Sequence, residues 1–168
     1  MSMIIYTDKF DRSTVSEHQK NILLAFFERR RIFDRYLKEN AIPILTCSCC
    51  GFPTLLNPRG YEICSICSWQ DDYQDDNNAD EIWGGPNHLS LTESRIKIGE
   101  ELNSIAEKLG GKINTDPHEV LLIIAQGDSK YEDVLKTALP AVDLKNIRST
   151  RFHHEGQSLL WQLIDIPK

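Results

Sequence analysis

The stretch that decides the fold begins with Cys47-Ser48-Cys49-Cys50-Gly51 and continues to Tyr61-Glu62-Ile63-Cys64-Ser65-Ile66-Cys67. It holds all five cysteines of the chain, and four of them form two Cys-x2-Cys turns with thirteen residues between the pairs. Each such turn brings two thiolates to one side of a tight loop, so two turns supply the four soft ligands of a closed tetrahedral metal site. The spacing predicts one structural metal ion, with zinc the first choice. The predicted ligands are Cys47, Cys50, Cys64 and Cys67.

The residues between the two turns favour a hairpin. Asn57-Pro58-Arg59-Gly60 places Asn, Pro and Gly at the type I turn positions that prefer them. We therefore expect residues 54–56 and 61–63 to pair as strands. A hairpin flanked by two Cys-x2-Cys turns is a zinc ribbon.

Other uses of the cysteines stay open at this level. Disulfides are disfavoured because nothing marks the chain as secreted and five cysteines leave one unpaired. A tetrathiolate site also accepts iron, and zinc is preferred because the sequence shows no redox partner motif. Cys49 is the spare thiol. We expect it to point away from the metal, and the alternative is that it exchanges with Cys47 or Cys50 as a ligand.

The order of motifs resembles the cysteine-rich CPCC family of bacterial proteins. After the two cysteine turns come Trp69-Gln70-Asp71-Asp72, then Gly84-Gly85-Pro86-Asn87, then Ser90-Leu91-Thr92-Glu93-Ser94-Arg95. The resemblance covers about residues 47–95. It implies a bound metal and a zinc-ribbon-like fragment, and proteins similar to this family are associated with bacterial toxin systems.

The sequence departs from the family pattern at three positions. Ser48 and Ser65 stand where the family tends to have proline, and Gln70 stands where it tends to have glutamate. The missing prolines make both turns less rigid, but none of these changes removes a metal ligand.

Composition is that of an ordinary globular protein, with 40% apolar and 26% charged residues. No apolar run approaches the ~18 residues that would cross a bilayer, and the N-terminus lacks the features of a signal peptide. Together with reduced cysteines, these observations predict a cytoplasmic protein that does not contact a membrane.

The acidity of the chain comes from one segment. Between Gln70 and Ser94 there are seven acids and no Lys or Arg, and without them the net charge of −6 would be +1. Such a segment repels phosphates, which makes nucleic acid an unsuitable partner there, and it attracts a basic protein. We expect these acids to be exposed. The predicted partner-binding residues are Asp71, Asp72, Asp75, Asp76, Asp80 and Glu81.

Two long helices are predicted on either side of this region. Thr14-Val15-Ser16-Glu17 has the form of a capping box, and apolar residues recur at helical spacing to about Glu39. Ser90, with Glu93, caps a second helix that Gly110-Gly111 stops. On the first helix, Arg29-Arg30-Arg31 is either a solvated face with partners such as Glu28 and Asp34, which we favour, or a nucleic-acid contact.

The C-terminal half predicts helices packed on a small sheet. Glu119–Ala125 is a nearly continuous apolar run between Pro117 and Gly127, which is typical of a central strand. Ser129 opens a further helix that ends near Pro140. Residues 147–152 and 159–166 are expected to pair as a hairpin.

These elements predict an α+β fold, in which a zinc-ribbon-like hairpin is inserted between helices and a small C-terminal sheet is packed by helices. We expect residues 1–168 to form a single compact unit. Residues 44–95 are its metal-binding segment and residues 96–168 its α/β layer.

The function that best fits these features is binding rather than catalysis. No Walker loop, Gly-x-Ser-x-Gly or His-Glu-x-x-His motif is present, although a hydrolase-type enzyme stays an alternative. The favoured interpretation is a cytoplasmic immunity or inhibitor protein that neutralises a basic bacterial toxin, with a nuclease as one fitting class. A second alternative is a zinc-ribbon regulator or nucleic-acid-binding module that uses Arg29, Arg30 and Arg31.

Overall fold

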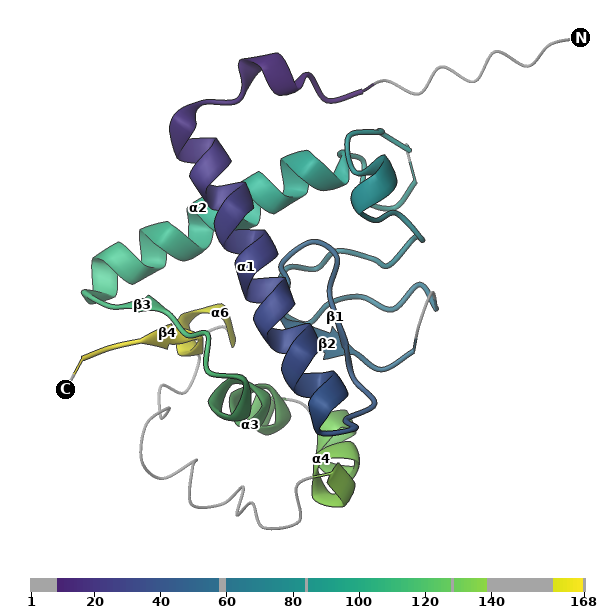
Figure 1. The fold of residues 1–168 in the computed structure, drawn as a ribbon, viewed down its shortest axis with the longest axis vertical. Helices are drawn as coiled ribbons and strands as arrows, with labels where there is room; N and C mark the ends of the chain where they lie inside the picture. Colours follow the sequence, from purple (N-terminus) through teal and green to yellow (C-terminus); the bar gives the residue numbers. More distant parts are fainter. Residues whose placement is uncertain (1–8, 58–59, 84, 128, 139–158, 168) are drawn as a thin grey trace, which may run out of the picture.

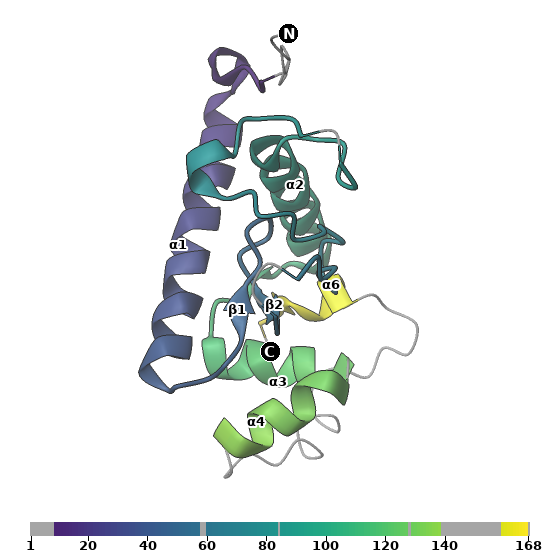
Figure 2. The ribbon, with the colours of Figure 1, turned by 90° about the vertical axis from the view of Figure 1, so that its right-hand side faces the viewer.

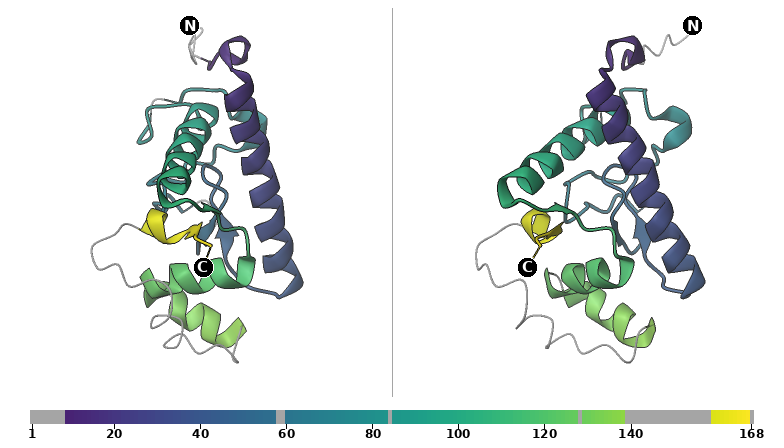
Figure 3. Two further views of the ribbon diagram at one scale, coloured as in Figure 1. Left: turned by 90° about the vertical axis from the view of Figure 1, so that its left-hand side faces the viewer. Right: turned by 60° about the vertical axis from the view of Figure 1, so that its left-hand side comes forward.

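The computed structural model describes residues 9–57, 60–83, 85–127, 129–138 and 159–167. Two long helices, α1 (Glu17–Glu39) and α2 (Leu91–Leu109), cross each other, and the cysteine segment lies beside both (Figures 1 and 2). Two further helices, α3 (Pro117–Gly127) and α4 (Glu132–Ala138), lie at one end of the molecule (Figure 3). The shorter elements are η1 (Arg12–Thr14), β1 (Leu45–Thr46), β2 (Pro53–Leu55), η2 (Asp76–Asn78), β3 (Lys112–Ile113), η3 (Ser129–Tyr131), α6 (Leu159–Gln162) and β4 (Ile164–Asp165).

Helix α1 begins two residues later than the sequence predicts. Its N-cap is Ser16, whose hydroxyl accepts from the backbone N–H of Gln19 while the Gln19 side chain accepts from the Ser16 N–H. The predicted capping box at Thr14 is wrong, because Thr14 belongs to η1 and its hydroxyl donates to the Asp11 carbonyl. The predicted end at Glu39 is confirmed.

Both ends of α2 are confirmed. The Ser90 hydroxyl accepts from the Glu93 N–H, and Gly110 ends the helix in the left-handed region with φ of 63°. A residue with a Cβ rarely adopts that conformation, which is why glycine terminates helices in this way.

The sheets are small and antiparallel, so the α+β class is confirmed. β1 pairs with β2, with Leu45 opposite Leu55, and β3 pairs with β4, with Ile113 opposite Ile164. The predicted pairing of residues 54–56 with 61–63 is wrong, because the partner of β2 is β1 and Ile63 forms its bridge with Gln70. Residues 58–59 of the predicted turn lie outside the described part of the chain.

The predicted central strand at 119–125 is also wrong, because these residues lie in α3. All six residues from Val120 to Ala125 are buried. A helix that is covered on every side loses the apolar-polar alternation that reveals its period, so its sequence looks like a buried strand.

The rest of the C-terminal prediction has a mixed outcome. η3 and α4 form the helix predicted from Ser129. In place of a strand at 159–166 the chain forms α6 and then the short β4. The predicted strand at 147–152 lies outside the described residues.

The core is continuous from the cysteine segment into the helices. Phe33 of α1, Leu102 of α2 and Ile123 of α3 belong to the same buried cluster as Cys47 and Cys64. Within the described ranges, no helix combines the length and apolarity that a bilayer crossing requires.

Gly99 is the residue that lets α1 and α2 approach closely. A Cβ built at Gly99 would overlap with the Cγ2 atom of Ile22 across the helix contact. We expect Gly99→Ala to destabilise the fold by about 1 kcal/mol, because an overpacking cost of roughly 1–3 kcal/mol is offset by a gain of about 1 kcal/mol in helix propensity. Urea unfolding of the metal-loaded protein measures this.

The matched control is Asn103→Ala, at an exposed position of the same helix. It gains helix propensity without meeting another helix, so its stability should not fall. Equal unfolding midpoints for the two variants would contradict the close packing of α1 on α2.

Candidate metal centre

The two Cys-x2-Cys turns have the same backbone geometry. In the first, the Cys47 N–H donates to the Phe52 carbonyl at 2.8 Å, and the Gly51 N–H donates to the Cys47 carbonyl at 2.9 Å. In the second, the equivalent bonds run from Cys64 to Trp69 and from Ser68 to Cys64, at 2.9 and 3.0 Å. Each turn is therefore closed by backbone hydrogen bonds to residues beside it in the sequence. The turns keep their shape without a long hairpin between them.

The residue after each pair lies in the left-handed region. Gly51 has φ of 80° and Ser68 has φ of 65°. Glycine adopts this conformation freely, whereas serine is strained in it. The backbone conformation of the second turn is therefore less favourable than that of the first.

The turns bring the four predicted ligands together. Their sulfur atoms all lie within 4.8 Å of one another. The Sγ atoms of Cys47 and Cys67 are 3.6 Å apart, and those of Cys50 and Cys64 are 3.7 Å apart. Four sulfurs at about 2.3 Å from one ion define a tetrahedron with an edge of about 3.8 Å. The donor set and its spacing therefore fit a single tetrahedral metal ion.

The surroundings of the sulfurs favour thiolates. The N–H of Cys49 lies 3.4 Å from the sulfur of Cys47, and the N–H of Ile66 lies 3.4 Å from the sulfur of Cys64. The Thr54 hydroxyl is 3.0 Å from the Cys64 sulfur. Donors aimed at sulfur stabilise its negative charge and orient it toward the metal.

Burial sets the acidity of the thiols. It raises the pKa of Cys47 and raises that of Cys50 well above the usual range. Burial acts in the same direction at Cys64, but hydrogen bonds with the other ligand cysteines and with Thr54 outweigh it and hold the Cys64 pKa well below its ordinary value. Since a metal binds thiolates, its binding must release the remaining protons.

Cys49 does not belong to the four-sulfur set. It occupies the place in the first turn that Ile66 occupies in the second, and both side chains are buried in the core. At this position, Cys49 packs as a small apolar residue.

Two buried arginines hold the first turn against the helices. The Nε of Arg29 in α1 donates to the Cys50 carbonyl at 2.8 Å, and the Nε of Arg95 in α2 donates to the Ser48 carbonyl at 2.8 Å. Arg95 also stacks on the ring of Phe26, with its Cζ 4.2 Å from the ring centroid. Both helices are thus tied directly to the metal-binding loop.

The charge of Arg29 has an unusual environment. It is only 3% exposed, and among the described residues no ion pair joins it to a carboxylate. Burial lowers its pKa, and negative charge on nearby sulfurs, that of Cys50 first, acts in the opposite direction. A buried cation without a counter-charge is costly, so its position beside the sulfurs indicates that the cluster carries negative charge.

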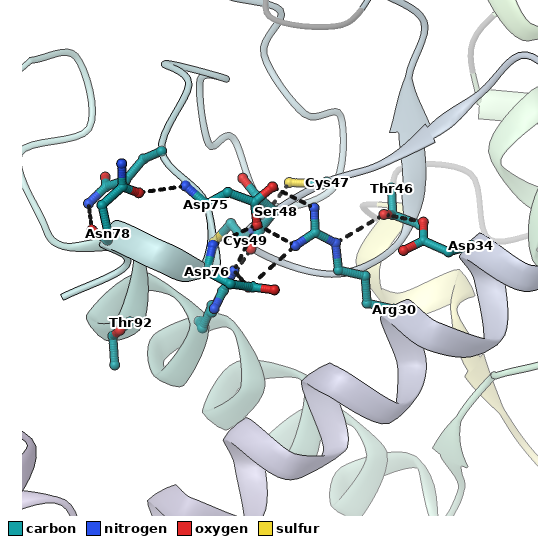
Figure 4. A network of polar contacts seen from close by, with 12 residues as sticks. Arg30, Asp34, Thr46, Cys47, Ser48, Cys49, Asp75, Asp76, Asn78 and Thr92 are labelled. Carbon is teal, nitrogen blue, oxygen red and sulfur yellow. Dashed lines mark hydrogen bonds and ion pairs between the residues drawn. The ribbon is translucent and has the colours of Figure 1, made fainter. Parts of the chain in front are cut away.

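The acidic segment wraps around the outside of these arginines. Figure 4 shows Arg30 reaching from α1 between Asp75 and Asp76 on one side and Thr46 on the other. The two carboxylate oxygens of Asp75 accept from Arg30 at 2.7 and 3.1 Å, and Asp76 accepts from Arg95 at 2.7 Å. Partial burial alone would raise the pKa of Asp75, but Arg30 outweighs that effect and lowers it.

The expectation that the acids are exposed is wrong for most of them. Asp72 is buried, and its carboxylate accepts from the Gln74 N–H and the Asn87 side chain. Asp80 accepts from Arg12 and Thr92. Asp71, Asp75, Asp80 and Glu81 are partly buried, and Asp76 alone among the six predicted residues is fully at the surface. Arginines distant in sequence compensate part of the charge that looks uncompensated along the chain.

The arginine run on α1 divides into three environments. Arg31 is exposed and pairs with Glu28, as predicted for a solvated face. The same prediction is wrong for Arg29, which is buried, and for Arg30, which pairs with Asp75.

Sequence reasoning missed Arg29, Arg95 and Thr54 as parts of the centre. A signal for Arg29 was present, because it lies three residues after Phe26 and four before Phe33, on the buried face of the helix. Arg95 is the last residue of a motif already singled out. For Thr54 the sequence offers no such signal.

Comparison with known proteins agrees with this picture. Residues 45–101 match the family model described as Cysteine-rich CPCC, which is about a third of the chain, and the resemblance noted from the sequence is confirmed. The chain matches none of the curated proteins and none of the solved structures with which it was compared.

The assignment of ligands predicts different behaviour for Cys64 and Cys49. Cys64→Ala removes one of four ligands and should reduce bound metal from about one ion per chain to a small fraction, with loss of the folded cysteine segment. Cys49→Ala, which removes an equally buried sulfur, should keep the metal. Elemental analysis after gel filtration measures the content. Equal loss of metal in both variants would show that the ligand set is wrong.

The position of Arg29 predicts that it supports the charged cluster. Arg29→Met keeps much of the apolar stem but removes the charge and the bond to the Cys50 carbonyl. We expect metal affinity to fall about tenfold or more, since a charged hydrogen bond of this kind contributes ~1.5–3 kcal/mol. Competition with a chromogenic chelator measures the affinity.

Arg31→Met is the control, because Arg31 lies two residues away on the exposed face. Its affinity for the metal should match that of the unchanged protein. Equal affinities for all three proteins would contradict a supporting role for Arg29.

Proposed function

We propose that the four cysteines bind a structural zinc ion and that this protein acts by binding a partner rather than by catalysis. The observation that carries the proposal is the enclosure of the site. Four thiols face one another at the spacing of a complete tetrahedron, and three of them are buried. A catalytic zinc keeps a position open for water, and a site with four sulfur ligands has none.

Zinc is preferred over iron for this site. Both metals accept four thiolates in a tetrahedron. Backbone amides and the Thr54 hydroxyl contact the sulfurs, and Arg29 and Arg95 join the loop to α1 and α2. A metal without redox chemistry is sufficient for that role. We also propose that the protein resides in the cytoplasm, where thiols stay reduced.

A basic protein is the proposed partner. Three arginines, Arg12, Arg30 and Arg95, pair with acids of the 70–81 segment, and the six acids outnumber them. The same segment contains Tyr73, whose ring contacts that of Tyr61, and the two residues, Tyr61 and Tyr73, are 54% and 45% exposed. Exposed tyrosines beside surplus negative charge are typical of protein-binding surfaces that favour a positively charged partner.

We propose further that the partner is a bacterial toxin, which this protein neutralises as an immunity protein. Two points support this: the resemblance of the cysteine segment to a family whose relatives are associated with toxin systems, and the charge, which suits a basic enzyme such as a nuclease.

Nucleic-acid binding by the arginine run is the less favoured candidate. Arg29 and Arg30 are engaged inside the protein and Arg31 pairs with Glu28, so the run offers phosphates no free cluster of cations.

The test of the partner surface uses exposed residues, because reversing Asp72 or Asp75 would disturb the fold. A Tyr61→Lys, Tyr73→Lys double variant adds positive charge where the basic partner is proposed to dock. We expect it to keep its zinc and fold but to protect cells poorly when co-expressed with the toxin encoded at the same locus. Binding should weaken by about tenfold or more, since a central interface aromatic contributes ~2 kcal/mol.

Leu24→Lys is the matched control, because Leu24 is 65% exposed on α1 and is equally apolar. It should protect as well as the unchanged protein. Full protection by a folded double variant, or a locus without a toxin gene, would contradict the proposal.

A further inference from the structure

A cavity of about 270 Å³ lies between the two cysteine turns and α2, and it is lined by Cys49 and Cys67. The other three cysteines do not line it. Solvent reaches the cavity, because several of its further lining residues are exposed, namely Ser68, Pro86, Lys97 and Glu101. The cavity therefore leads from solvent to one of the four predicted metal ligands and to the cysteine that is not a ligand.

Cys67 is the least protected of the four predicted ligands. It is partly exposed, whereas Cys47, Cys50 and Cys64 are buried, with at most 1% of their surface accessible. The susceptibility of a cysteine to oxidation depends on its thiolate character and on its exposure. An oxidant that arrives from solvent therefore reacts first at the sulfur of Cys67.

The thiol of Cys49 lies next to that of Cys67. Hydrogen bonds with neighbouring thiols, that of Cys47 first and that of Cys49 next, raise the pKa of Cys67 well above its usual range. The sulfur of Cys49 is thus close enough to interact with the sulfur of Cys67. Cys49 nevertheless stands outside the set of four sulfurs that lie within 4.8 Å of one another. It is a neighbour of a ligand without being a ligand itself.

We propose that Cys49 and Cys67 form a disulfide bond when the protein meets a hydroperoxide, so that the pair is an oxidation site at the edge of the metal centre. The Cys67 thiolate attacks one oxygen of hydrogen peroxide, the O–O bond breaks, and Cys67 becomes a sulfenic acid while hydroxide leaves. The Cys49 sulfur then attacks the Cys67 sulfur, the S–O bond breaks, and the oxygen leaves as water with the proton of the Cys49 thiol. The two sulfurs together lose two electrons, which reduce the peroxide to hydroxide and water.

Cys47 is the competing partner for Cys67, because the two sulfur atoms are 3.6 Å apart. An attack by Cys47 would remove a second ligand from the metal site, whereas an attack by Cys49 removes none beyond Cys67. A disulfide with Cys49 leaves three of four ligands, so the affinity for metal falls. This consequence rests on the proposed function of the four cysteines, whereas the pairing of the two thiols does not.

The experiment treats the full chain, as purified and reduced, with a small molar excess of hydrogen peroxide. Remaining thiols are blocked with iodoacetamide, and the disulfides are located by tandem mass spectrometry. We expect Cys49–Cys67 as the main product. A chromogenic chelator measures the affinity for metal before and after treatment. The affinity should fall by about tenfold or more, since tenfold is the lower end of the effect of losing a group that only supports a ligand.

Cys49→Ala is the informative variant, because it keeps all four predicted ligands and removes the thiol that closes the disulfide. The yield of disulfide at Cys67 should fall, and dimedone, which traps sulfenic acids, should label Cys67 in its place. Ser48→Ala is the matched control, since Ser48 is the neighbour of Cys49 in the same turn and does not line the cavity. It should form the Cys49–Cys67 disulfide as the unchanged protein does.

Three outcomes would overturn the inference: a disulfide between Cys47 and Cys67 as the main product; equal yields of disulfide at Cys67 in Cys49→Ala and in the unchanged protein; or cysteines that all stay reduced. The results also separate this inference from the proposed metal site. A Cys49–Cys67 disulfide in protein that held no metal as purified would retain the reactive pair and remove the structural zinc. Zinc that stays bound, with every cysteine reduced after peroxide, would do the reverse.

Discussion

The constraint on which this structure depends is the convergence of four sulfur atoms on one point. Two loops that are distant in sequence, at 47–50 and 64–67, present thiols at distances that fit one tetrahedral ion. Without a metal, four such groups would be held together in the interior with their pKa values shifted in opposite directions, which is an unfavourable arrangement. A bound metal would instead join these segments through four metal–sulfur bonds. The segments have little regular secondary structure of their own. β1 and β2 have only a few residues each, and neither would persist in isolation.

The charges around this point are ordered in layers. A divalent metal ion held by four thiolates would carry two negative charges. Two buried arginines lie next to the cluster and donate hydrogen bonds to carbonyls of its first turn, namely Arg29 and Arg95. Outside them, Asp75 and Asp76 pair with Arg95 and Arg30. Each layer offsets the charge of the one inside it, so the arginines connect the acidic segment to the first cysteine turn. This arrangement explains how an irregular segment with few backbone pairs comes to be held against two helices.

The sequence was sufficient for the features that depend on local chemistry. Cys-x2-Cys spacing picked out the four cysteines that the fold brings together, Ser90 and Gly110 identified both ends of α2, and helical spacing identified α1. It was insufficient where the outcome depends on distant residues. The apolar run of α3 has no period because neighbours cover it on all sides, so helix and strand look alike. The acids of 70–81 seem uncompensated because their arginines are as far away in sequence as Arg12 and Arg30. Arg29 resembled a surface residue because arginine is seldom buried, and only its spacing from Phe26 and Phe33 shows its face.

The proposed metal has an architectural role: it holds a loop, the loop positions two arginines, and these position an acidic, tyrosine-bearing surface. The central claim is that one zinc ion holds all four cysteines, and the most direct measurement is X-ray absorption at the zinc edge on the protein as purified. We predict a single shell of four sulfur atoms at about 2.3 Å, with no nitrogen or oxygen ligand. A shell with three sulfurs and one lighter atom would contradict it, because such a site has an exchangeable position. So would protein that holds no metal and has its cysteines joined as disulfides.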